Sequence, residues 1–224
     1  MEKLSIFEFI QNLANIHLEK AYNQYINDIP KNNLHCYLIH QMKAKADILL
    51  LGEASGYAGC RYTGIPFTDG HVLSTSPFYA EMRKEGLMTI PIKNHIERTA
   101  TMVYKFLGIH PTIFPRVVFW NAFPFHPFDT TPDSNRPPKP EELELGRNIV
   151  YDLFQIFNFK EYHGIGRCGF ETLQWMKSNK DIPSFEPTFI KHPSYGGITQ
   201  FKIDVCNVLH IKNEQKTLNF MVKK

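Results

Sequence analysis

The sequence lacks the patterns that mark several common classes of protein. Its four cysteines, Cys36, Cys60, Cys168 and Cys206, are far apart and form no C-x-x-C pair, so neither a zinc site nor a redox motif is predicted. No apolar stretch is long enough to cross a bilayer. The first twenty residues also lack the small-residue cleavage site of a signal peptide. Dispersed cysteines are typical of a reducing compartment. We therefore expect a cytoplasmic protein with no metal and no cofactor.

An excess of charge of one sign is also lacking. The 25 basic and 22 acidic residues leave a formal net charge of +3, which permits a nucleic-acid partner without requiring one. Internal repeats, linkers and low-complexity tracts are missing too. The 224 residues therefore predict one domain, 1–224, with a core of its own and an N-terminal helical segment, residues 1–30, packed on it. G-x-G-x-x-G spacing is missing as well, which argues against a Rossmann-type nucleotide-binding protein.

The most informative stretch is residues 46–69, which read ADILLLGEASGYAGCRYTGIPFTD. The apolar run at 48–52 predicts a short strand that is covered on both faces, as in a parallel sheet. Glu53 follows at the carboxyl end of that strand, where open α/β sheets bind their ligands. Nearby glycines permit tight turns and a close approach of the backbone to a ligand: Gly52, Gly56 and Gly59. From these residues alone, Glu53 is equally well explained as a solvated turn residue.

Hydrophobic periodicity predicts helices and strands that alternate along the chain. Helices are expected over residues 4–19 and onward to Pro30, which should end them, and over 34–45, 71–84 with a break at Pro77, 96–107, 141–157, 170–177 and 199–209. Strands are expected over 48–52, 116–120, 162–166 and 188–191. This alternation indicates an α/β fold, a three-layer α/β/α sandwich with a central four-stranded, mainly parallel sheet.

Three of the four predicted strands end in loops with unusual chemistry, at residues 53–67, 121–126 and 192–197. The carboxyl ends of parallel strands lie on one edge of a sheet, so these loops are expected to converge on one cleft. The cleft would then hold a carboxylate, an amide, an imidazole, an aromatic ring and a glycine-rich lip.

The same three loops resemble the three motifs of the uracil-DNA glycosylase superfamily. GEASGYAGCRYTGIPFT is similar to the first motif, closest to the bacterial branch that has GEAPG followed by a G-x-PF segment. WNAFPFHP followed by SNRPPKPEEL resembles the middle motif, and HPSYGG resembles the closing motif. The resemblance covers about residues 34–201. It implies a glycosylase fold and an enzyme of base excision repair, which flips uracil out of DNA and hydrolyses its N-glycosidic bond to leave an abasic site.

The resemblance assigns the catalytic roles to Glu53 and His192. His192 would donate a hydrogen bond to the uracil O2 as negative charge develops there. Glu53 would orient or activate the attacking water and offset the cationic sugar. Asp69 is a competing acid for that task. A histidine outside such a motif is more often structural or exposed.

The implied substrate-binding residues are Gly52, Ala54, Phe67 and Asn121. Phe67 would stack on the flipped base, and the Asn121 amide would pair with the N3–H and O4 of uracil, whereas cytosine presents the opposite donor pattern. Without the motif, Phe67 is explained by core packing, and Asn121 by a turn at the end of a strand.

Contacts to DNA are expected at phosphates, through backbone amides, hydroxyl groups and basic side chains. The candidates are Ser194, Tyr195, Gly196, Gly197, Arg61 and Arg136, with Lys191 nearby. Tyr195 would fill the vacated place in the base stack. Each basic residue is also explained as a solvated surface cation.

Two positions depart from the family pattern. Ser55 stands where the family commonly has proline, which should loosen the loop. Gly56 stands where some branches have a bulky tyrosine that blocks the thymine methyl, so thymine must be excluded by another group. We expect a monomeric enzyme acting on uracil in single- or double-stranded DNA. It should be monofunctional, without lyase activity, because apart from Lys191 no motif lysine is placed to form a Schiff base. The alternatives are a glycosylase for another deaminated or damaged base, and a non-catalytic DNA- or uracil-binding protein.

Overall fold

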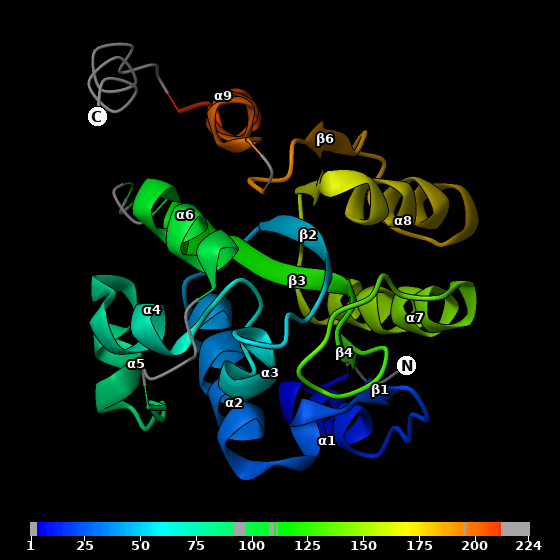
Figure 1. Ribbon diagram of the computed structural model, residues 1–224. Coiled ribbons are helices and arrows are strands. Elements are labelled where there is room, and N and C mark those ends of the chain that lie inside the picture. Colours follow the sequence, from blue (N-terminus) through cyan, green and yellow to red (C-terminus); the bar gives the residue numbers. More distant parts are fainter. Residues whose placement is uncertain (1–3, 92–96, 108–109, 111, 195, 212–224) are drawn as a thin grey trace.

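The computed structural model describes residues 4–91, 97–107, 110, 112–194 and 196–211. Its centre is a four-stranded sheet in the order β3-β2-β5-β6, with every neighbouring pair parallel. The strands are β2 (Ile48–Ala54), β3 (Val117–Phe123), β5 (Glu161–Ile165) and β6 (Thr188–Ile190). Helices cover both faces (Figure 1). The predicted three-layer α/β/α sandwich with a parallel sheet is thus confirmed.

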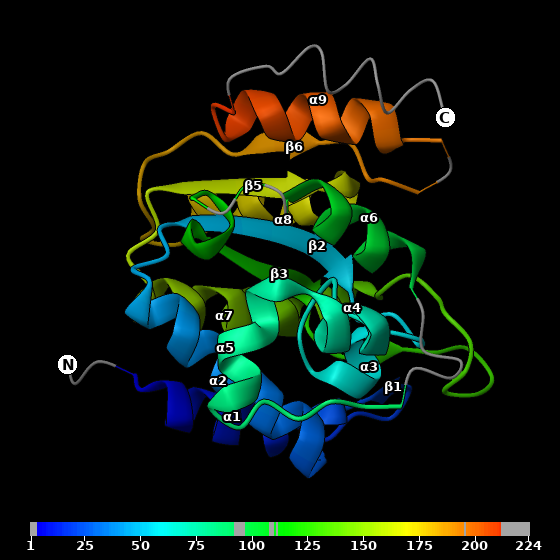
Figure 2. The same cartoon turned by 90° about the vertical axis from the view of Figure 1, so that its left-hand side faces the viewer.

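The two faces of the sheet carry different helices. α7 (Pro140–Ile156) and α8 (Gly166–Asn179) lie on one face. α4 (Gly70–Thr75), α5 (Ala80–Lys84) and α6 (Arg98–Leu107) lie on the other. Beyond the β3 edge lie α1 (Ile6–Ala14) and α2 (Asp28–Lys43), and α9 (Ile198–Val208) lies along β6 (Figure 2). In Figure 2 the strand arrows point toward α3 (Cys60–Thr63) and the 128–139 loop, so the carboxyl edge faces them.

Burial of the central strands explains this arrangement. Leu49, Leu50 and Leu51 of β2 are fully buried, and all seven residues of β3 are buried. Continuous apolar sequence of this kind needs cover on both faces, which the helices provide. α7 begins with a proline at its first position and two acidic residues in its first turn, as suits the positive end of a helix.

The prediction of a helix from residue 4 through to Pro30 is wrong. α1 ends at Ala14 and is followed by β1 (Ala21–Tyr22), which pairs with β4 (His126–Pro127), and by η1 (Gln24–Ile26). The Asn23 amide donates to the carbonyls of Leu13 and Ile16 at 2.8 and 2.9 Å, and thereby caps the end of α1.

Pro30 begins a helix instead of ending one. It lies in the first turn of α2, where a missing backbone N–H has no partner to lose. The predicted break at Pro77 is confirmed, because η2 (Pro77–Tyr79) separates α4 from α5. The short η3 (Phe114–Arg116) leads into β3. Within the described residues, no helix has the length and apolar character needed to span a membrane.

Candidate functional site

The carboxyl edge of the sheet carries a cavity of about 650 Å³. Its walls come from the ends of β2 and β6, from the 128–139 loop and from the start of α8. Of the residues singled out in the sequence, it brings together Glu53, Ala54, Ser55, Gly56, Arg136, His192 and Ser194. Segments 140 positions apart in the chain therefore meet because parallel strands end on one side.

Gly52, Phe67 and Asn121 form a separate cluster at the end of β2, outside the lining of this cavity. Gly52 and Asn121 are partners in the β2–β3 register. A Cβ at residue 52 would come within 2.4 Å of the Phe67 ring and 2.8 Å of the Asn121 Oδ1, so only glycine fits. Phe67 and Asn121 are buried, and among the described residues the Asn121 amide has no hydrogen-bond partner.

The backbone of Phe67 is strained. Its φ of +56° lies in the left-handed region, which is uncommon for a bulky residue. Its ring packs against Phe119 with a centroid separation of 5.6 Å. Strain of this kind concentrates at functional sites, where the surrounding structure holds the residue in place.

His192 is half-buried and held in one orientation. The backbone N–H of Ser194 donates to Nδ1 at 3.2 Å, and the Ser194 Oγ lies 2.7 Å from the same atom. Because Nδ1 accepts, a neutral ring carries its proton on Nε2. Burial, together with the neighbouring Lys191 charge, lowers the pKa of His192. The ring therefore offers a neutral Nε2–H donor at neutral pH.

The two acids weighed as activators of water differ in their surroundings. Both carboxylate oxygens of the buried Asp69 are occupied: Oδ1 accepts from the Val72 N–H at 2.7 Å, and Oδ2 accepts from the Glu97 N–H at 2.7 Å. Asp69 is thus the N-cap of α4. Glu53 is exposed to the cavity, where partial burial raises its pKa. Asp69 is a structural residue, and Glu53 remains available.

Arg61 does not fit the predicted phosphate contact. It is buried, and its guanidinium donates to Asp133 at 2.7 Å and to the Pro132 carbonyl. It also lies over the Tyr62 ring, 4.5 Å from the centroid. This prediction is corrected because the donors that a phosphate would need are directed into the 128–139 loop.

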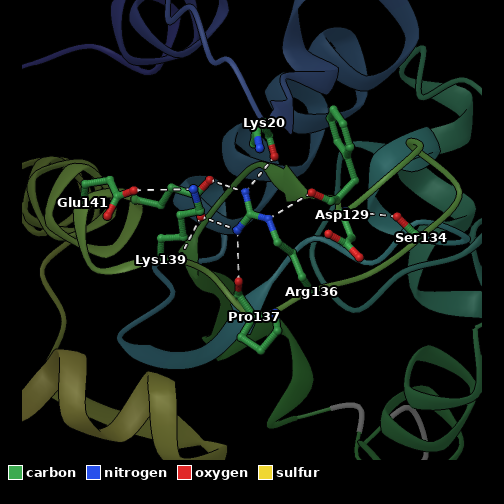
Figure 3. Close-up of polar contacts among 9 residues, drawn as sticks. Lys20, Asp129, Ser134, Arg136, Pro137, Lys139 and Glu141 are labelled. Carbon is green, nitrogen blue, oxygen red and sulfur yellow. Dashed lines mark hydrogen bonds and ion pairs between the residues drawn. The ribbon is translucent and has the colours of Figure 1, made fainter.

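The prediction for Arg136 is corrected for the same reason. Its three nitrogens donate to the carbonyls of Lys20, Phe128 and Pro137 and to both oxygens of Glu142, over distances of 2.6 to 3.0 Å (Figure 3). The side chains of Arg136 and Glu142 are only 14% and 11% exposed. Arg136 therefore ties the 128–139 loop to α7 and to the N-terminal segment, although it also borders the cavity.

Ser55 does not loosen the first loop. Its N–H donates to the Phe125 carbonyl at 3.2 Å, a bond that proline could not make, and its Oγ donates to the Pro124 carbonyl at 2.7 Å. His126 bridges the same loops, with ring nitrogens 2.8 and 2.9 Å from the carbonyls of Ser55 and Pro132. This predicted loosening is wrong because a serine at 55 replaces proline stiffness with hydrogen bonds.

The closing loop has two positions at which the backbone restricts the side chain. Gly196 is exposed with a φ of +78°, and a Cβ at Gly197 would meet the His192 carbonyl at 2.1 Å. Both positions therefore require glycine. Tyr195 lies outside the described residues, so the predicted wedge stays a prediction.

Two further charged residues border the cavity, and the sequence motifs did not point to them. Glu97 precedes α6, and Arg167 stands in the first turn of α8 with 86% of its side chain exposed. Neither lies in a motif, and each resembles an ordinary polar residue near the start of a helix. Over the ranges that the structure describes, no three histidine, cysteine or acidic side chains are grouped to hold a metal ion.

No protein-family model matches the chain, and no match was found among curated proteins. Among solved structures, the crystal structure of wild-type Pedobacter heparinus SMUG2 superposes with a TM-score of 0.61. The alignment covers 94% of this chain and 96% of SMUG2 at 15% sequence identity. The two proteins share a fold. At 15% identity the similarity shows the fold alone, and the chemistry must be argued from the residues of the site.

Proposed function

We propose that the protein is a DNA glycosylase that removes uracil and leaves an abasic site. The observation that carries the proposal is the meeting of Glu53 and His192 in one cavity at the carboxyl edge of the sheet. SMUG2, whose fold the chain shares, is a member of the uracil-DNA glycosylase superfamily. The three motif-like loops, which resemble the same superfamily, end at this edge.

The base would be held at the cluster formed by Gly52, Phe67 and Asn121. Gly52 of this cluster directly precedes Glu53, which lines the cavity. Cleavage of the N-glycosidic bond leaves negative charge on the base, which the Nε2–H of His192 would stabilise by a hydrogen bond to O2. The Asn121 amide, which has no protein partner among the described residues, would pair with N3–H and O4 of uracil. Glu53 would face the cationic sugar and the incoming water.

DNA would bind across the rim of the cavity. Arg167 is exposed there, and Lys191 is exposed beside His192. With the backbone of Gly196 and Gly197 and the hydroxyl of Ser194, these groups suit phosphate contacts.

The test is cleavage of a labelled oligonucleotide that contains one uracil, followed by alkali, in single-stranded, U:A and U:G contexts. We expect strand breaks at uracil with the wild-type protein. An Asn121→Asp variant should lose uracil activity and gain activity on cytosine, because a carboxylate accepts from the exocyclic amine. DNA binding without cleavage would contradict the proposal and favour another lesion or a non-catalytic role.

A further inference from the structure

Two glycines of the first loop make room for a carboxyl group of the protein itself. A Cβ at Gly56 would lie 3.1 Å from the Glu97 Oε2, and one at Gly59 would lie 2.0 Å from the same atom. The glycines were expected to let a ligand come close to the backbone, and the Glu97 side chain occupies space beside both of them. The backbone of Glu97 is fixed by its 2.7 Å hydrogen bond to Asp69.

The carboxyl group of Glu97 is costly to keep in this place. Its Oε2 is buried and has no hydrogen-bond partner among the described residues, although the residue borders the cavity that holds Glu53 and His192. Buried polar atoms nearly always find a partner, and an exception calls for an explanation. A side chain that served only to fill space could be apolar here. Within the described part of the chain, the carboxyl group of Glu97 is thus an unpaired polar group at the wall of the cavity.

The charges around Glu97 favour its neutral form. Burial, and next the negative charge of Asp69, raise the pKa of Glu97 to about 7. Among the described residues, the titratable and charged groups that face it or share the cavity are Cys60 of α3, Asp69 at the start of α4, Glu53, Arg136, Arg167 and His192. A carboxyl group that titrates near neutral pH is an efficient proton acceptor there.

We propose that Glu97 is a catalytic residue of this site and the base that takes the proton from the attacking water. The inference rests on the proposed glycosylase function and adds a residue to it. As the C1′–N1 bond breaks, its electron pair goes to the uracil ring and is stabilised by His192. The water oxygen bonds to C1′ and its proton moves to the Glu97 carboxylate. The Glu53 carboxyl group faces the positive charge that develops on the sugar. The uracil anion later takes a proton from solvent.

The experiment is a single-turnover measurement of uracil release between pH 5 and 9 for the wild type, Glu97→Gln, Glu53→Gln and Glu144→Gln. Glutamine keeps the size of the side chain and removes its titration. We expect the wild-type rate to rise about tenfold per pH unit up to about pH 7 and then to level off. Glu97→Gln should be about 100-fold slower at pH 8 and should lose this acid limb.

The controls separate the possible failures. Glu53→Gln should be slower but keep the limb near pH 7, and Glu144→Gln, exposed on α7, should behave as wild type. Release by Glu97→Gln with an unchanged acid limb would overturn the role of Glu97 while the glycosylase function stands. Absence of release by the wild type at every pH would overturn the glycosylase function, and this inference with it.

Discussion

The charged residues that line the cavity or lie behind its lining fall into two kinds, those with hydrogen-bond partners and those without such partners in the described part of the chain. Arg136 and Asp69 have partners for all the charged atoms of their side chains, through Glu142, backbone carbonyls and backbone amides. Glu53 and Glu97 make no side-chain hydrogen bond to the described residues, although one is partly and the other largely withdrawn from water. Arg136 and Asp69 therefore hold the loops, whereas the carboxyl groups of Glu53 and Glu97, unpaired within the described residues, suit the catalytic roles proposed for them.

The largest effect on stability is expected at Arg136. Replacing it in an Arg136→Met variant leaves the Glu142 carboxylate in a nearly buried site without its partner, and removes donors from two loop carbonyls. Breaking such a pair costs about 3 kcal/mol of unfolding free energy. Urea denaturation measures this loss. A variant as stable as the wild type, but weak in DNA binding, would return Arg136 to the phosphate contacts predicted from the sequence.

The Glu97→Gln substitution should increase the free energy of unfolding, whereas Arg136→Met should decrease it. Between pH 4.5 and about 7 the unfolded chain loses the Glu97 proton while the folded protein keeps it, so wild-type stability falls as pH rises through this window. Glutamine has no such window. The variant should therefore exceed the wild type by about 1 to 3 kcal/mol at pH 8, and by little at pH 4.5. Thermal unfolding at both pH values measures this, and equal gains at both would contradict the raised pKa.

The smallest effect is expected at Arg167, the exposed counterpart of Arg136. Arg167→Met should leave the unfolding free energy within about 0.5 kcal/mol of wild type. If the residue contacts a phosphate, DNA affinity should fall at low salt, and the slope of log affinity against log salt should decrease by about 1. An unchanged slope would remove Arg167 from the DNA interface.

The sheet could be predicted because its signal is local. The apolar runs at 48–52 and 116–120 and the polar residues after them mark strands and their ends, and parallel topology then brings the ends together. The partners of Arg61 and Arg136 could not be predicted, because a basic residue in a loop has the same appearance whether it meets Asp133, Glu142 or solvent. Glu97 was missed because its role depends on Gly56 and Gly59, about 40 positions earlier in the chain.

The helix predicted from residue 4 to Pro30 was also wrong because of contacts that the local sequence pattern does not reveal. The apolar period of residues 4–18 does continue toward Pro30, but hydrogen bonds from Asn23 back to Leu13 and Ile16 stop the helix. Hydrophobic spacing predicts which residues are buried. It does not predict that a side chain several residues further along the chain caps the end of a helix. Ile6, Phe9, Ile10 and Leu13 are nevertheless buried in the same hydrophobic cluster as the strands.

The most direct test of the account is the release of free uracil from single-uracil DNA by the wild type, His192→Ala and Arg136→Met, measured alongside their stability. We predict release by the wild type and a rate about 100- to 1,000-fold lower for His192→Ala with its fold intact. Arg136→Met should be destabilised but keep its rate per folded molecule. No release by the wild type, or an unchanged rate in His192→Ala, would contradict it.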